Sequence, residues 1–142
     1  MIEYPDFHSF KSLEKYWSFR EQLFTTKDPD EIENICWQMI KYVRPAIDEQ
    51  KEFNEQYKQA RKENAEYFGW DYQDRQESSF VTAEPFKRYA IVCEKKGNLP
   101  QAIWACQQAI SLGLTDDGTK AGMKGRLEKL MKRYELCQDK KR

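Results

Sequence analysis

Histidine is nearly absent from this chain, and no two cysteines have the spacing of a metal site. His8 is the only histidine, and the four cysteines never form a Cys-x-x-Cys pair. A four-coordinate zinc site needs Cys or His ligands at usable spacing, so we expect no bound metal and no cofactor. A Cys–His nucleophile pair is disfavoured, because all four cysteines lie in helical apolar patterns.

Long apolar runs and a secretory leader are also missing. No stretch approaches the roughly 20 apolar residues that a membrane helix needs. The N-terminus, Met-Ile-Glu-Tyr-Pro-Asp, lacks the basic patch and apolar core of a signal peptide. We therefore expect a cytoplasmic protein without a membrane segment. In a reducing compartment, the cysteines are interpreted as small buried hydrophobic residues without disulfides, namely Cys36, Cys93, Cys106 and Cys137.

The patterns of acid–base and phosphate chemistry are lacking as well. No carboxylate stands isolated in an apolar context that would raise its pKa for proton transfer. Residues 113–120 resemble a phosphate-binding loop only superficially, because Asp116 and Asp117 lie where a phosphate would sit. We interpret this segment as a turn in which Asp117 or Thr119 caps the next helix. The sequence therefore predicts a protein that is not an enzyme.

Charge is abundant and unevenly distributed, although the net charge is zero. Residues 1–83 hold 11 Lys/Arg against 17 Asp/Glu, whereas residues 84–142 hold 13 against 7. Two solvated faces that neutralise each other would explain this asymmetry. The alternative is a basic C-terminal surface that meets an acidic partner or nucleic acid.

Helical periodicity dominates the N-terminal half, and no segment shows strand alternation. A helix is predicted over about 9–24, and a second begins at the Asp28 cap with Pro29 in its first turn. Pro45 is expected to interrupt that helix, and a third should run from there to Phe68, closed by Gly69. The expected buried positions of the first helix are Phe10, Leu13, Trp17 and Phe24, and those of the second are Ile32, Ile35, Cys36, Met39, Ile40 and Val43.

Residues 69–83 have no helical period and are predicted to form a long connector. It would separate an N-terminal part, 1–68, from a C-terminal part, 84–142, and both parts are expected to belong to one compact domain. Trp70 and Tyr72 in the connector either hold it to the fold or are exposed contact residues.

The segment 83–116 is predicted to form a helix, a tight turn and a second helix. This pattern resembles a tetratricopeptide repeat, because Phe86 and the large–small pair Tyr89-Ala90 match it, as do Gly97 in the turn and two later alanines, Ala102 and Ala109. The match covers one repeat, a quarter of the chain. Cys93 and Cys106 replace residues that are usually aromatic, and Leu114 stands where proline is common.

The resemblance implies a stack of helical hairpins whose concave face holds a peptide or a partner helix. One repeat cannot bury its own faces, so the helix from about 119 to 137 would act as a cap. The expected fold is therefore all-α, with antiparallel hairpins stacked as a small tetratricopeptide-like bundle. Three glycines at the start of the last helix, Gly118, Gly122 and Gly125, indicate either close packing or close approach of an anion or partner.

Two functions are consistent with these patterns. The first is a non-catalytic interaction module, an adaptor or regulator, that binds a protein partner. Its candidate binding residues are Lys87, Arg88, Lys95, Trp104, Lys120, Lys124 and Arg126. The alternative is a nucleic-acid-associated accessory factor that uses the basic final helix. Its candidate phosphate contacts are Lys120, Lys124, Lys132, Lys140, Lys141 and Arg142.

Overall fold

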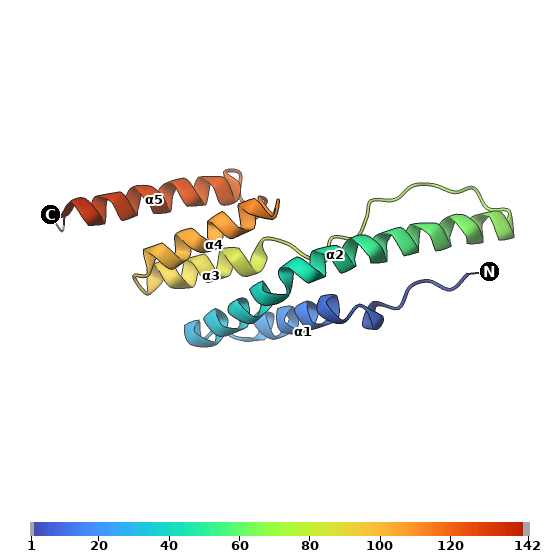
Figure 1. Cartoon of the computed structure of the whole chain (residues 1–142), viewed down its shortest axis with the longest axis horizontal. Coiled ribbons are helices and arrows are strands. Elements are labelled where there is room, and N and C mark those ends of the chain that lie inside the picture. The colour runs from blue at the N-terminus through green and yellow to red at the C-terminus, as the bar shows by residue number, and fades with distance from the viewer. Residues whose placement is uncertain (1, 141–142) are drawn as a thin grey trace. The chain divides into compact units, whose positions relative to one another are not determined.

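The computed structural model describes residues 2–140, and these contain helices and connecting segments without any strand (Figure 1). The all-α prediction is therefore confirmed. Two of the candidate phosphate contacts, Lys141 and Arg142, lie outside the described residues. No helix in the described part of the chain is both long and apolar enough to span a membrane. The elements are η1 (Phe7–Ser9), α1 (Lys11–Thr25), α2 (Pro29–Phe68), α3 (Glu84–Lys95), α4 (Leu99–Ser111) and α5 (Gly122–Lys140).

Helix α2 continues through Pro45 for 40 residues, so the predicted interruption is wrong. Its start is as expected, because the Asp28 carboxylate accepts the Asp30 N–H at 3.1 Å and Pro29 follows the cap. Pro45 cannot donate to the carbonyl one turn earlier, which weakens the helix locally. Val43 and Ala46 on either side are fully buried. Their packing outweighs the local cost of the proline.

The chain forms two compact units that do not follow the linear division expected from the sequence. Unit 1 comprises Met1–Ser18 and Tyr42–Val81, and unit 2 comprises Phe19–Lys41 and Thr82–Arg142. Helices α1 and α2 each contribute residues to both units. The segment 19–41 therefore belongs with the C-terminal residues rather than with the rest of the N-terminal half.

An aromatic cluster around Phe53 organises unit 1. The Phe53 ring is buried, and the rings of Phe7, Phe10 and Phe80 meet it edge-on with centroids 6.1, 5.6 and 5.4 Å away. Such edge-to-face pairs stabilise beyond the apolar area they bury. Phe80 comes from the connector, so the cluster holds the last part of the connector against α2.

Side-chain amides on α2 hold two irregular segments of unit 1 in place. Asn54 Nδ2 donates to the Ser78 carbonyl at 2.9 Å, and Gln50 Oε1 accepts the Val81 N–H at 2.9 Å. The Asn64 side chain binds the backbone of Ile2. Its Oδ1 accepts the Ile2 N–H at 2.8 Å, and its Nδ2 donates to the Ile2 carbonyl at 3.0 Å. These bonds replace the backbone pairing that a segment without secondary structure lacks.

In unit 2, α4 packs against both α3 and α5. The turn between α3 and α4 contains the predicted glycine, because Gly97 is left-handed at φ +82°. The Asn98 side chain accepts the Gln101 N–H at 3.3 Å and caps α4. Small side chains allow the helices to approach closely. The fully buried ones on α4 are Ala102, Ala105, Cys106 and Ala109.

Two residues that were predicted to be buried are exposed. Phe24 is 60% exposed, because it lies in the last turn of α1 with its ring beneath the Arg20 guanidinium, and Leu23 takes the buried position. Cys137 is exposed near the end of α5, whereas Cys36, Cys93 and Cys106 are buried as expected. All four cysteines are free thiols.

Candidate functional site

A groove of about 480 Å³ opens in unit 2 between the start of α2 and the outer face of α3. Three apolar side chains, Ile32, Ile91 and Val92, give it an apolar floor together with Pro29. The remaining lining residues are all cationic. They are Lys27, Arg88, Lys95 and Lys96. We call this site the basic groove.

Local sequence explains how α3 presents its wall of the groove. Arg88, Ile91, Val92 and Lys95 follow one another at helical spacings of three and four, so they share one face. Val92 is buried, Ile91 is half-buried and Lys95 is exposed, so solvent exposure increases across this face. The result is an apolar strip with a charged border.

Two of the four cations are already engaged. Lys96 contacts the Asp30 and Glu33 carboxylates of α2, and hydrogen bonding to these carboxylates raises the pKa of Lys96 above its ordinary value. Arg88 donates from Nη1 to the Leu23 carbonyl at 3.2 Å, which orders its guanidinium at the end of α1. These contacts fix two sides of the groove.

The other two cations, Lys27 and Lys95, are exposed. Within residues 2–140, no carboxylate lies in ion-pair distance of either ammonium group. They are therefore available to an incoming anionic group. The groove combines a small apolar surface with two uncommitted positive charges.

The structure divides the seven sequence-predicted binding residues into three groups. Arg88 and Lys95 line the basic groove, and Lys87 is half-exposed beside them on α3 without lining it. Trp104 belongs to an aromatic cluster on the same unit. The other three, Lys120, Lys124 and Arg126, surround the start of α5.

Trp104 is half-buried against two aromatic rings. Its centroid lies 5.5 Å from that of Trp37 and 6.3 Å from that of Tyr89. The Tyr89 hydroxyl accepts a hydrogen bond from Gln101 Nε2 at 3.0 Å, and burial raises the pKa of Tyr89. These contacts give Trp104 a packing role that its sequence position did not indicate.

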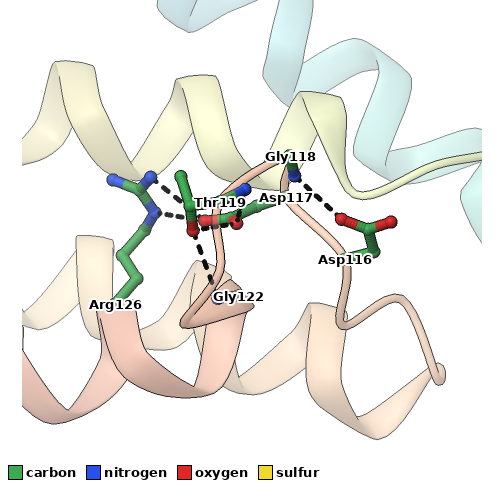
Figure 2. A network of polar contacts seen from close by, with 6 residues as sticks. All are labelled: Asp116, Asp117, Gly118, Thr119, Gly122 and Arg126. Atoms are coloured by element: carbon green, nitrogen blue, oxygen red, sulfur yellow. Dashed lines mark hydrogen bonds and ion pairs between the residues drawn. The ribbon is translucent and has the colours of Figure 1, made fainter.

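Arg126 is not a free surface cation, because it pairs with the buried Asp117. Figure 2 shows its guanidinium directed at that carboxylate, with Nε at 3.2 Å and Nη2 at 3.1 Å from Oδ2. The other oxygen of Asp117 accepts the Thr119 N–H at 2.9 Å. Lys120 and Lys124 are exposed, so they alone of this group are available to a partner.

The loop before α5 contains the predicted cap of that helix and explains why Gly122 is a glycine. The Thr119 hydroxyl accepts the Gly122 N–H at 3.2 Å, so Thr119 caps α5 as predicted (Figure 2). Gly122 is left-handed at φ +69°, and a Cβ there would lie 2.7 Å from the Thr115 carbonyl oxygen. Close backbone packing therefore requires glycine at this position.

Sequence reasoning missed most of the groove, including Lys27, Ile32 and Ile91 as functional residues. These residues come from segments about sixty positions apart, and no local pattern signals that residues 27–32 face residues 88–96. The two uncommitted lysines resemble any other surface lysine in the sequence.

Among residues 2–140, no group of three or more His, Cys, Asp and Glu side chains is placed to hold a metal ion. No model of a protein family matches the chain, and no curated protein or solved structure matches it either. The tetratricopeptide-like reading of residues 83–116 therefore stays a prediction.

Proposed function

We propose that this chain is a non-catalytic protein-interaction module whose basic groove binds an acidic peptide segment with a bulky apolar side chain. The observation that carries the proposal is the lining of the groove, an apolar floor with only cationic residues around it. Its volume of about 480 Å³ lies within the range of ligand-binding clefts. The apolar side chain would occupy the floor, and acidic neighbours would meet Lys27 and Lys95.

The two kinds of contact would contribute differently. Burying one large aliphatic or aromatic side chain is worth about 1.5–3 kcal/mol, so the floor supplies most of the affinity. Exposed ion pairs with lysines contribute about 0.2–1 kcal/mol each, so the lysines chiefly select acidic sequences and accelerate association. Unit 2 carries 16 Lys/Arg against 12 Asp/Glu, which favours attraction of an acidic partner.

The proposal is tested by panning a random peptide library against the full chain and measuring the affinity of an enriched peptide by fluorescence anisotropy. We expect enrichment of peptides in which Asp or Glu flank a Leu, Phe or Trp. Lys27→Glu with Lys95→Glu should weaken binding at least about tenfold, through lost attraction and new repulsion between like charges. Ile91→Ala should weaken it by shrinking the apolar floor.

The matched control is the double reversal Lys120→Glu with Lys124→Glu, which changes the same charge elsewhere on unit 2. It should leave the affinity of the peptide nearly unchanged. Enrichment of peptides without acidic residues, or equal losses from both double reversals, would contradict the proposal. Salt-sensitive retardation of nucleic acid that only the Lys120/Lys124 variant loses would instead favour the nucleic-acid accessory factor.

A further inference from the structure

Unit 1 exposes three neighbouring aromatic rings at the C-terminal end of α2. Tyr67, Phe68 and Trp70 are 69%, 44% and 63% exposed. The rings of Phe68 and Trp70 stack with centroids 4.7 Å apart, and Tyr67 meets Phe68 edge-on at 4.9 Å. We call these three residues the aromatic patch. Contiguous exposed apolar surface of this kind is typical of an interaction site.

The backbone beneath the patch is held by the cap of α2. Gly69 is left-handed at φ +72°, its N–H donates to the Glu66 carbonyl at 3.3 Å, and the Trp70 N–H donates to the Ala65 carbonyl at 2.8 Å. Apolar residues at the position of Trp70 frequently pack back onto the helix. Here the indole stacks on Phe68 and faces solvent. A ring displayed on a fixed backbone loses little conformational entropy when a partner binds.

The charges beside the aromatic patch are negative. A shallow groove next to Tyr67 is lined by Ile2 and Gln59 together with two carboxylates, Glu63 and Glu66. Asp71 follows Trp70 and is exposed. The C-terminus of α2 adds its own partial negative charge. Unit 1 as a whole carries 8 Lys/Arg against 12 Asp/Glu.

Two cations on α2, before the aromatic patch, are directed elsewhere. The Arg61 guanidinium and the Lys62 ammonium both lie over the Tyr72 ring, each 5.4 Å from its centroid. Arg61 also donates to the Gln73 carbonyl at 2.9 Å. Neither engages a ring of the aromatic patch. The ring faces of the patch that do not take part in the Phe68–Trp70 stack are therefore open to a cation supplied by a partner.

We propose that the aromatic patch, with Glu63 and Glu66, binds a basic peptide segment of a partner protein. Arginine or lysine side chains would lie over the exposed ring faces, where the negative π-face attracts a cation. Their neighbours would pair with the two carboxylates. This surface lies in unit 1 and selects the opposite charge from the basic groove, so neither proposal depends on the other.

The test is an NMR titration of the full chain, following the indole N–H resonance of Trp70, which is assigned by its loss in Trp70→Phe. The probe is an unstructured peptide of alternating Arg and Gly, and its matched control alternates Glu and Gly. We expect the Trp70 resonance to shift with the Arg probe alone. The indole resonance of Trp37, in unit 2, serves as an internal reference that should not move.

Variants then separate ring contacts from general electrostatics. Trp70→Ala should weaken binding of the Arg probe at least about tenfold, as loss of a central aromatic contact does. Glu63→Gln with Glu66→Gln should weaken it several-fold and reduce its dependence on salt. Phe24→Ala removes another exposed ring, in unit 2, and should leave the affinity unchanged. Circular dichroism of each variant verifies that the helices are retained.

The proposal would be overturned by an unshifted Trp70 resonance, by equal shifts with both probes, or by unchanged affinity in Trp70→Ala. Concentration-dependent self-association that Trp70→Ala abolishes would also overturn it, because the patch would then be an interface between copies of this chain. None of these results affects the basic groove, whose test uses Lys27 and Lys95.

Discussion

At the scale of single residues, Asp117 organises the loop that precedes α5. Its side chain is fully buried, and it accepts hydrogen bonds from Thr119 and from the Arg126 guanidinium. Burial by itself disfavours the charged carboxylate. The contacts with Thr119 and Arg126 outweigh that penalty and hold the pKa of Asp117 below its ordinary value. The carboxylate therefore stabilises the fold while it is ionised.

The replacement Asp117→Asn should lower the free energy of unfolding at neutral pH by about 1–3 kcal/mol, because charged hydrogen bonds are lost in a buried site. A lowered pKa in the folded state gives stability that is present above the unfolded value of about 3.9 and lost as pH falls through the folded value. The difference between variant and wild type should therefore shrink below about pH 4. Urea unfolding at neutral and acidic pH measures it.

Asp116→Asn provides the matched control, because Asp116 is exposed and accepts the Gly118 N–H at 2.9 Å in the same loop. It should change stability little at either pH. Equal destabilisation by the two replacements would show that the loop, rather than the buried ion pair, carries the effect.

Arg126 was expected from the sequence to be a surface contact, and its partner Asp117 could not be identified because the sequence does not show which carboxylate is buried.

At the scale of elements, helix ends were predicted where their chemistry is local. Helix ends stand as expected at Asp28 with Pro29, at Gly69 and at Gly97. The continuous helix through Pro45 was not predicted, because the decisive factor is tertiary packing of Val43 and Ala46. The hydrogen bonds of the Asn54 and Asn64 side-chain amides were not predicted either. Their partners lie 24 and 62 positions away, which no periodic pattern reveals.

The α3–α4 pair gives a prediction at this scale. Ala102 is fully buried on α4, where the helix packs against α3. Ala102→Trp should destabilise the protein by about 1–3 kcal/mol or more, because the added ring forces closely packed helices apart. Thermal unfolding followed by circular dichroism measures the loss. Gln107→Trp adds the same ring to an exposed position of α4 and should melt close to wild type. Similar melting of both variants would refute close packing at Ala102.

At the scale of the whole molecule, the two compact units differ in the sign of their net charge. Unit 1 has an excess of carboxylates and unit 2 an excess of cations, although the total is neutral. The sequence revealed the asymmetry between its halves. It did not reveal that residues 19–41, which are acidic, belong with the basic C-terminal residues. That assignment rests on long-range contacts within unit 2, such as Trp37 with Trp104 at 5.5 Å and Lys96 with Asp30.

Cleavage of the connector tests this assignment. Arg75 is exposed and is the only Lys or Arg in residues 69–83, so brief trypsin treatment should cut there first. The two fragments each carry part of unit 2, because residues 19–41 lie in the first and residues 82–142 in the second. They should therefore elute together in gel filtration and separate only in denaturant. Arg75→Gln, which removes the site, should resist the same treatment. Fragments that separate without denaturant would instead support independent N-terminal and C-terminal parts, 1–68 and 84–142.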